Sequence, residues 1–167
     1  MPGLSRSIVE HRLPIKPGYK PYQQPPRRCK ADMYDAIKAE VTRLYDAGFI
    51  RPCRYAERIS NIVPVIKKNG KLRVCIYFQD LNKANPKDEY PMPIADQLVD
   101  ATSGNKIISF MDGNAGYNQI FMVEEDIPKT AFRCPGEIGL FEWVVMTIGL
   151  KSAGATYRSE GYELYIP

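Results

Sequence analysis

The stretch 61–78, NIVPVIKKNGKLRVCIYF, decides the fold class of this chain. Two apolar, β-branched runs flank Asn69-Gly70, a dipeptide typical of a two-residue hairpin turn. We therefore predict two antiparallel strands, 61–66 and 72–78. Because side chains alternate along a strand, one face of the second strand is predicted to be apolar, with Leu72, Val74, Ile76 and Phe78, and the other polar, with Lys71, Arg73, Cys75 and Tyr77. Lys67 and Lys68 add positive charge at the tip.

An amphipathic helix is predicted before the hairpin. Apolar residues recur there at helical spacing, at Met33, Ile37, Val41 and Leu44. We expect Asp32 to cap the start of this helix and Gly48 to end it.

Residues 1–30 are rich in proline, with Pro2, Pro14, Pro17, Pro21, Pro25 and Pro26. Proline lacks a backbone donor and favours an extended backbone, so we predict an extended arm that ends in Arg27-Arg28. The alternative is a disordered linker, which the same composition favours when residues 1–30 are considered alone.

Downstream of the hairpin, a short helix is predicted over 94–102, followed by an apolar strand over 106–111 that ends at Asp112. A second hairpin is predicted from strands 130–134 and 141–146 around Pro135-Gly136. The resulting fold class is α+β: an extended arm, a hairpin with its helix, and a sheet covered on one side by helices.

Charge divides the chain into two halves. Residues 1–88 carry 18 Lys and Arg against 8 Asp and Glu, whereas residues 89–167 carry 5 against 11, and the net charge is +4. A basic half favours a phosphate-bearing partner, and an acidic half offers carboxylates for a cation; solvated surface charge is the alternative.

No apolar run approaches the roughly 20 residues of a membrane span, and no signal-peptide core opens the sequence. We expect a chain that enters no membrane.

The four cysteines, Cys29, Cys53, Cys75 and Cys134, have no C-x-x-C spacing, and His11 is the single histidine. A zinc site is therefore not expected. We interpret the cysteines as reduced thiols, which places the protein inside the cell, in the cytoplasm or the nucleus.

Asp112 is the candidate catalytic residue and metal ligand. It follows an apolar strand and precedes Gly113, so a carboxylate and an uncovered backbone carbonyl face the same space, which suits Mg²⁺. Taken alone, such an aspartate is more often a turn cap.

The upstream hairpin carries four cations suited to bind a triphosphate, namely Lys67, Lys68, Lys71 and Arg73. A charged strand edge that prevents aggregation is the alternative.

Several ordered motifs carry a resemblance to a known family. They are 60–76 (SNIVPVIKKNGKLRVCI), 80–83 (DLNK), 90–93 (YPMP), 110–117 (FMDGNAGY), 129–132 (KTAF) and 149–156 (GLKSAGAT). In this order they resemble the reverse transcriptases of gypsy-type long-terminal-repeat retrotransposons. The resemblance extends from about His11 to Tyr157.

This resemblance implies a role for individual residues and a set of partners. Asp112 would be the first metal-binding aspartate, with Gly113 beside it, and Tyr117 the steric gate against ribonucleotides. Lys68 and Arg73 would contact the incoming triphosphate, and Gly149 would line the pocket beneath the nucleotide. Arg27, Arg28, Lys67 and Lys71 are assigned to nucleic acid. The implied partners are an RNA or DNA template-primer and a dNTP, with Mg²⁺ as the cofactor.

The sequence also departs from the family pattern. Tyr77 stands where the family usually has aspartate, Gln79 where it has arginine, Ile148 where it has phenylalanine, and Arg58 where it has tryptophan. These departures affect the fingers and the nucleotide pocket.

After Tyr157 the family pattern continues with a long palm helix and a Tyr-x-Asp-Asp turn, whereas residues 158–167 read RSEGYELYIP. We therefore predict an arm (1–30), fingers with a partial palm (31–157) and a divergent tail (158–167), that is, an incomplete right-hand polymerase fold. Two-metal phosphoryl transfer needs carboxylates on both sides of the ion pair, so this chain is predicted not to polymerise alone. Glu124, Glu125 and Asp126 are interpreted as a solvated turn. The alternatives are a non-catalytic nucleic-acid-binding module and a non-functional pseudogene product.

Overall fold

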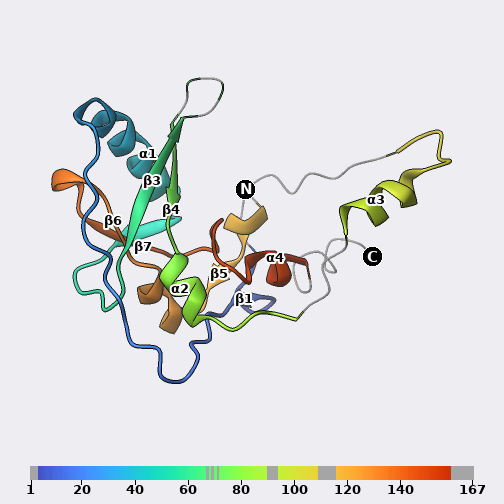
Figure 1. The fold of residues 1–167 in the computed structure, drawn as a ribbon, viewed down its shortest axis with the longest axis horizontal. Helices are drawn as coiled ribbons and strands as arrows, with labels where there is room; N and C mark the ends of the chain where they lie inside the picture. The colour runs from blue at the N-terminus through green and yellow to red at the C-terminus, as the bar shows by residue number, and fades with distance from the viewer. Residues whose placement is uncertain are drawn as a thin grey trace.

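The computed structural model describes residues 4–66, 68, 70, 72–89, 94–108 and 116–158. It combines short helices with a five-stranded sheet of order β2-β7-β6-β3-β4 and a two-stranded sheet of order β1-β5 (Figure 1). The strands are β1 (Glu10–His11), β2 (Ile50–Pro52), β3 (Ser60–Ile66), β4 (Leu72–Ile76), β5 (Phe121–Met122), β6 (Phe132–Arg133) and β7 (Leu140–Trp143). The α-helices are α1 (Tyr34–Asp46), α2 (Gln79–Ala84), α3 (Ala95–Thr102) and α4 (Ala153–Thr156), and the 3-10 helices are η1 (Ala31–Met33), η2 (Gly116–Gln119), η3 (Glu124–Thr130) and η4 (Gly136–Ile138).

The first predicted hairpin is confirmed, and it forms one edge of the five-stranded sheet, with β4 as the edge strand. β3 and β4 pair antiparallel from Ile62 opposite Ile76 to Ile66 opposite Leu72. The predicted faces are also correct, because Val74 and Ile76 are buried while Arg73 is exposed. The second strand ends at Ile76, two residues earlier than predicted, because Phe78 turns into the core at the start of α2.

The second predicted hairpin is confirmed in a shorter form. β6 and β7 pair antiparallel, with Phe132 opposite Phe141, and Gly136 adopts a φ of +61° in the connection. β6 also pairs parallel to β3, with Ser60 opposite Phe132. This parallel contact joins the two hairpins into one sheet.

The helix before the first hairpin is confirmed, but its predicted cap is wrong. α1 buries Ile37, Val41 and Leu44, and Gly48 ends the helical segment with a φ of +71°. The N-cap is Met33, which makes no side-chain capping bond. Asp32 lies instead within η1, because the chain enters α1 through a 3-10 turn.

Residues 4–30 form no helix, include turns at 6–8 and 17–18, and pack against the rest of the chain. β1 pairs parallel to β5, and Val9 and Leu13 join the hydrophobic core. The backbone N–H of Gln24 donates to the Ile59 carbonyl at 2.9 Å. These contacts are incompatible with a disordered linker. The division of the chain at residues 30 and 157 stays a prediction.

In the segment 94–108 the predicted helix is present, but the start of the predicted strand is not. α3 confirms the short helix, but Lys106, Ile107 and Ile108 form no strand, and Ile107 is 87% exposed. The remainder of the predicted strand, 109–111, lies outside the described residues. A strand is stable only when a neighbour satisfies its backbone groups, and none of the described residues pairs with 106–108. Figure 1 shows α3 standing apart from the sheet.

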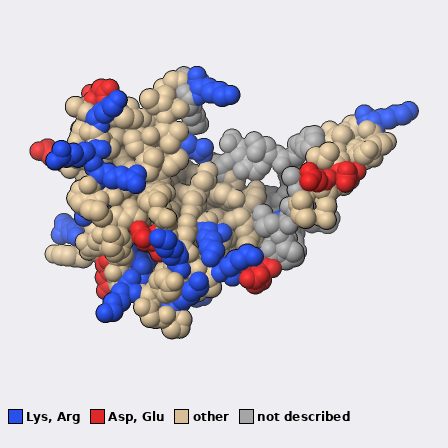
Figure 2. Space-filling model, in the orientation of Figure 1, with Lys and Arg blue, Asp and Glu red and all other residues tan. Residues whose placement is uncertain are grey.

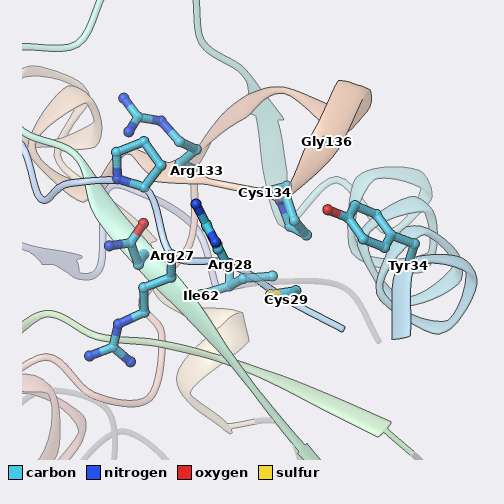
Figure 3. Close-up of a pocket in the computed structure, with 11 residues that line it drawn as sticks. Arg27, Arg28, Cys29, Tyr34, Ile62, Arg133, Cys134 and Gly136 are labelled. Atoms are coloured by element: carbon cyan, nitrogen blue, oxygen red, sulfur yellow. The ribbon is translucent and has the colours of Figure 1, made fainter. Parts of the chain in front are cut away.

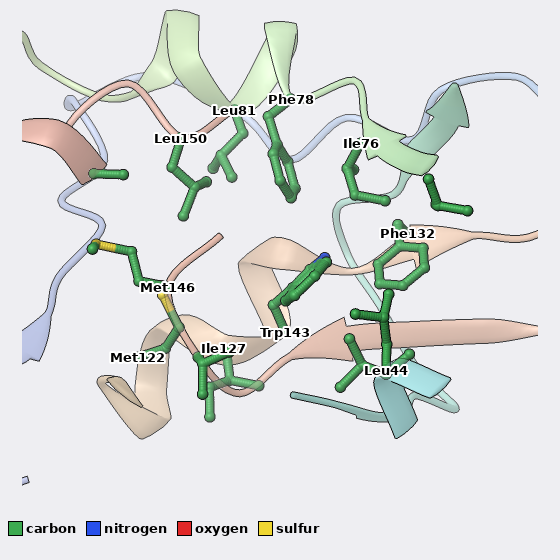
Figure 4. Close-up of a cluster of buried hydrophobic side chains, with 14 of the residues drawn as sticks. Leu44, Ile76, Phe78, Leu81, Met122, Ile127, Phe132, Trp143, Met146 and Leu150 are labelled. Carbon is green, nitrogen blue, oxygen red and sulfur yellow. The ribbon is translucent and has the colours of Figure 1, made fainter. Parts of the chain in front are cut away.

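The core lies between the sheet and the segments that follow β4 and β7. Figure 4 shows Phe78, Leu81 and Leu150 on one side and Trp143 and Phe132 facing them from the sheet side. Further buried side chains extend this core toward η3 and the arm, among them Met122, Ile127, Met146 and Leu13. The same packing fixes the end of β4 and the turn after β7, where the candidate site is found.

Candidate nucleotide and nucleic-acid site

An open hollow of about 560 Å³ lies where β4 ends, α2 begins and the chain turns after β7. Gly149, predicted to lie beneath the nucleotide, lines this hollow together with Ile76, Tyr77, Phe78, Gln79, Asn82 and Lys83. Two segments about 70 residues apart in sequence therefore meet here. The hollow gives the predicted nucleotide-pocket glycine a defined place in the fold.

Asn82 holds the Gly149 turn on both sides. Its Nδ2 donates to the Gly149 carbonyl at 2.7 Å, and its Oδ1 accepts from the Lys151 backbone N–H at 2.9 Å. Gly149 has a φ of +102°, which L side chains rarely adopt. Asn82 is a positioning residue that sequence reasoning did not single out, although the quoted motif 80–83 contains it.

Two of the departures from the family pattern touch each other. The Tyr77 hydroxyl donates to Oε1 of Gln79, and the Arg27 guanidinium lies 5.0 Å from the centre of the Tyr77 ring. Gln24, which is buried in the arm, donates through Nε2 to the Tyr77 carbonyl at 2.9 Å and to Asp80 Oδ2 at 2.8 Å. Residues 77 and 79 thus form a neutral hydrogen-bonded pair, and the arm holds it in place.

The predicted triphosphate-binding cations lie on the β3–β4 hairpin. Arg73 is exposed on the face of β4 that leads to Tyr77, four residues further on, or roughly 13 Å along a strand. Lys68 is exposed in the turn, and neither residue forms an ion pair within the described part of the chain. Lys67 and Lys71 lie outside the described residues. The described cations are therefore available to a ligand.

Tyr117, the predicted steric gate, lies in η2 and meets the ring of Tyr157 edge-on, with 5.3 Å between the ring centres. Gly116 makes this arrangement fit, because a Cβ at that position would lie 2.6 Å from the Tyr157 hydroxyl. Sequence reasoning missed both Gly116 and Tyr157. The gate function itself stays a prediction.

The predicted metal ligands, Asp112 and Gly113, lie outside the described residues. Within the described ranges no cluster of three or more His, Cys, Asp and Glu is suited to a metal ion. The interpretation of 124–126 as solvated is wrong for Asp126, which is buried, accepts from the Leu13 N–H at 2.6 Å and pairs with Lys129. Glu124 pairs with Arg51 at 2.6 Å. The described residues therefore do not fit a Mg²⁺ site.

Arg27 and Arg28 line a second, smaller hollow of about 270 Å³ between the arm, α1 and the β6–β7 connection. Arg133, which the sequence did not suggest, lies at the same hollow (Figure 3).

Figure 2 shows many Lys and Arg side chains over the body of the molecule, whereas α3 presents acidic ones, Asp96 and Asp100. Basic charge is thus concentrated around the sheet and the arm.

All four cysteines are free thiols. Burial raises the pKa of Cys134 to about 12 and that of Cys53 to about 11. Both thiols are therefore protonated at neutral pH, which makes them poor nucleophiles and poor metal ligands.

Comparison with known proteins identifies the family of the chain. The sequence profile of the family described as Reverse transcriptase (RNA-dependent DNA polymerase) matches residues 65–159, more than half of the chain. This chain belongs to the reverse transcriptase family. The matched range holds both β4 with Tyr77 and the Gly149 turn, so the larger hollow lies entirely within the reverse transcriptase match.

Similar proteins include the Transposon Tf2-3, Tf2-4 and Tf2-7 polyproteins of Schizosaccharomyces pombe. Each is 32% identical to this chain over 148 residues, which cover 89% of the chain and 10% of the relative. The chain therefore spans about a tenth of the length of these transposon polyproteins. Among its described helices, none is both long and apolar enough to cross a membrane.

Proposed function

We propose that this chain supplies the fingers and the nucleotide-entry part of the palm of an RNA-directed DNA polymerase from a gypsy-type long-terminal-repeat retrotransposon. The observation that carries the proposal is the hollow at Gly149, held open by Asn82, at the foot of a strand whose exposed face bears Arg73. A triphosphate is strongly anionic, and an arginine fork binds it through charge-assisted hydrogen bonds.

In this proposal each cation and ring has a distinct task. Arg73 and Lys68 neutralise the triphosphate, the Gly149 turn supports the base and sugar, and Tyr117 limits the space at the sugar. Asn82 acts indirectly, because it fixes the turn through both of its amide atoms. Lys67 and Lys71 add to the positive field at the tip of the hairpin.

Mg²⁺ is the proposed cofactor, with Asp112 and Gly113 as its proposed ligands. When bound, such an ion neutralises phosphate charge and activates the attacking hydroxyl. The proposed partners are an RNA or DNA template-primer and a dNTP, and the proposed location is the cytoplasm or nucleus.

We also propose that the 167-residue polypeptide does not extend a primer by itself. Two-metal transfer requires carboxylates on both sides of the ion pair, and the resemblance assigns only Asp112 within residues 1–167. Asp126 is no substitute, because it is bound to Lys129 and to the Leu13 N–H.

Two measurements on the purified chain test the proposal. The first is equilibrium binding of a fluorescent dNTP to the wild type, to Asn82→Ala and to Arg73→Gln, with Lys38→Gln on the exposed face of α1 as the charge-matched control for Arg73→Gln. We expect Arg73→Gln to weaken binding by about tenfold, which corresponds to one lost charge-assisted contact. Asn82→Ala should weaken binding as well, because it releases the Gly149 turn on both sides, and Lys38→Gln should bind as the wild type does. Equal affinity in all four proteins would contradict a nucleotide site at this hollow.

The second measurement is primer extension on a primed RNA template with Mg²⁺ and all four dNTPs. We expect no product from the wild-type polypeptide. Nucleotide addition that disappears in Asp112→Ala would refute the proposed inactivity and would at the same time assign the catalytic aspartate.

A non-catalytic nucleic-acid-binding module is the second candidate, because Arg27, Arg28 and Arg133 meet at one hollow with no acidic partner among the described residues. This candidate predicts binding that weakens steeply with salt, without any affinity for a dNTP. Such a result would favour it over the polymerase proposal.

A further inference from the structure

Two of the four free cysteines, Cys29 and Cys134, line the same small hollow. Cys29 belongs to the arm, and Cys134 directly follows β6, far away in the sequence. Figure 3 shows both residues at the wall of this hollow. The fold therefore brings together two thiols that the sequence keeps apart.

Packing and electrostatics both place these two thiols close to each other. Cys134 is 3% exposed and belongs to the hydrophobic core, and Cys29 is partly buried and packs against that core. The pKa of Cys134 is raised to about 12, first by burial and then by the charge of Cys29. Such an influence falls off within about 10 Å at ordinary ionic strength. The two side chains are therefore neighbours in the folded chain.

Hydrogen bonds hold the two walls that carry the thiols. The backbone N–H of Cys134 donates to the Gly139 carbonyl at 3.0 Å, across the β6–β7 connection. On the arm, the Pro25 carbonyl accepts from Nδ2 of Asn61 at 2.8 Å. A disulfide needs the two β carbons about 3.5–4.5 Å apart. Walls that are held in one arrangement favour one pairing of thiols over others.

The other two cysteines lie elsewhere in the fold. Cys53 follows β2, where its thiol donates to the Tyr55 carbonyl at 3.6 Å, and Cys75 lies on β4 opposite Val63. Neither is among the residues that line the smaller hollow. They therefore serve as internal controls for any reaction at Cys29 and Cys134.

The smaller hollow is also suited to attract an anion. Arg27, Arg28 and Arg133 line it, and none of them forms an ion pair within the described ranges. Guanidinium groups bind carboxylates through charge-assisted hydrogen bonds. Glutathione disulfide is such an anion, because it carries more carboxylates than amines. Its charge would bring a reactive disulfide to the side of the thiols.

We propose that Cys29 and Cys134 form a reversible disulfide that fastens the arm to the β6–β7 connection. The oxidant is an anionic small-molecule disulfide of the glutathione class, which the arginines of the hollow attract. Disulfides inside cells are usually transient and sense the redox state. This redox clamp goes beyond the polymerase function proposed above and does not depend on it.

The reaction consists of two thiol–disulfide exchanges. Cys29 is the more exposed thiol and reacts first: its sulfur bonds to one sulfur of glutathione disulfide, the old disulfide breaks, and one glutathione leaves with the Cys29 proton. The sulfur of Cys134 then attacks the Cys29 sulfur, and the second glutathione leaves with the Cys134 proton. Two protein thiols thereby lose two electrons and reduce one glutathione disulfide to two glutathiones. Proximity offsets the low reactivity of the buried Cys134.

The test uses the full chain in glutathione buffers of increasing disulfide content near neutral pH. After an acid quench, remaining thiols are blocked with N-ethylmaleimide in denaturant, and peptides are mapped by mass spectrometry without reduction. The wild type is compared with Cys29→Ser and with Cys134→Ala. The matched control is Cys53→Ser/Cys75→Ser, which removes two thiols outside the hollow.

We expect the wild type and the Cys53→Ser/Cys75→Ser control to give one cross-linked peptide pair, with residues 29 and 134. Oxidation should raise their melting temperature by roughly 5–15 °C, because the bond closes a long loop, and dithiothreitol should reverse the shift. Cys29→Ser and Cys134→Ala should show neither the cross-link nor the shift.

Three results would overturn the clamp. They are a glutathione adduct on Cys29 without a cross-link, a cross-link that involves Cys53 or Cys75, and four thiols that all stay reactive. Because Cys134 is buried, its variant is compared with the wild type by circular dichroism. If Cys134→Ala has lost the wild-type spectrum, Cys29→Ser decides by the same criteria.

A rate comparison tests the part assigned to the arginines. Arg28→Gln/Arg133→Gln should slow oxidation by glutathione disulfide about threefold and leave oxidation by the neutral disulfide of 2-mercaptoethanol unchanged. Arg12→Gln/Arg54→Gln, which removes two exposed arginines away from the hollow, should react as the wild type does. Equal rates with glutathione disulfide in all three proteins would refute the attraction by the hollow.

Discussion

In the arm at residues 4–30 and in the segment at 94–108, the burial of the side chains is the opposite of what the local sequence suggests. The arm is rich in proline, yet Leu13 and His11 are fully buried and β1 belongs to a sheet. The segment 94–108 has the helical spacing and the β-branched residues of a core element, yet Val99 is 67% exposed and Ile107 is 87% exposed.

This difference shows that burial depends on available partners more than on local composition. The arm finds backbone partners in Met122, Ile59 and Ala84, and each lies far from it in sequence. For 106–108 no such partner exists among the described residues, and unpaired strand groups do not stay in an apolar interior. Four predictions, from the largest expected effect to the smallest, test this comparison.

The largest effect is expected from truncating Leu13. Leu13→Ala removes a fully buried side chain and leaves a cavity, so the free energy of unfolding should fall by about 2–5 kcal/mol. Val99→Ala in α3 should change it by less than about 0.5 kcal/mol, because the side chain is exposed. Urea unfolding followed by circular dichroism measures both. Equal losses would show that the arm is no better packed than α3.

The second prediction concerns acid. Burial lowers the pKa of His11 to about 4 from 6.5, since its ring is fully enclosed and only Nδ1 has a hydrogen-bond partner, Thr156 Oγ1 at 2.8 Å. The unfolded chain binds this proton more readily, so the stabilisation is complete above pH 6.5 and is lost as pH falls from 6.5 to 4. The loss should be on the order of 3 kcal/mol.

Urea midpoints at pH 7.5 and 4.5 measure that loss. His11→Gln should show a smaller pH dependence than the wild type, whereas Asp100→Asn in the exposed α3 should keep the wild-type dependence. A pH dependence that is unchanged in His11→Gln would rule out the histidine as its source.

The third prediction concerns the buried amide that joins the arm to both hollows. Gln24→Ala leaves the Asn61 N–H and the Tyr77 carbonyl without this partner, at a cost of about 1–3 kcal/mol. For a chain of this length the melting temperature should fall by about 2–4 °C per kcal/mol. Gln97→Ala in α3 is the matched control and should melt with the wild type. A Gln24→Ala protein with the wild-type melting temperature would contradict the role of this network.

The smallest effect is expected at the start of the arm. Arg6 pairs with Glu10 at 2.5 Å, but Arg6 is exposed and Glu10 only half-buried, so Arg6→Ala should cost about 0–1 kcal/mol. The difference from the wild type should shrink further at high salt, because exposed ion pairs are screened. A loss comparable to that of Leu13→Ala would mean that charge rather than burial holds the arm.

Local patterns in the sequence predicted the β3–β4 hairpin, α1, α3 and the β6–β7 hairpin. The reason is that turn residues such as Asn69-Gly70 and helical spacing act over a few residues. The parallel pairing of β3 with β6 and the contact of β1 with β5 were not predicted, because strands distant in sequence leave no local signal of which partner they choose.

In the candidate site, too, some residues were found from sequence motifs and others only from the structure. Gly149 and Arg73 were singled out from the motifs; Gly149 lines the larger hollow and Arg73 is exposed on β4, and the roles assigned to both stay predictions. Asn82, Gln24 and Arg133 were missed, since each acts through a residue between 37 and 109 positions away. Asp112 and Gly113 stay predictions.

The sequence by itself determined the family, the β3–β4 hairpin and the basic charge of the front half, because these depend on residue types and short spacings. Only the tertiary structure decided that the proline-rich arm is buried, that Asn82 clamps Gly149, and that three arginines meet at one hollow. Such contacts arise when distant segments satisfy one another's backbone groups and bury one another's apolar surface, and no short stretch of sequence carries that information.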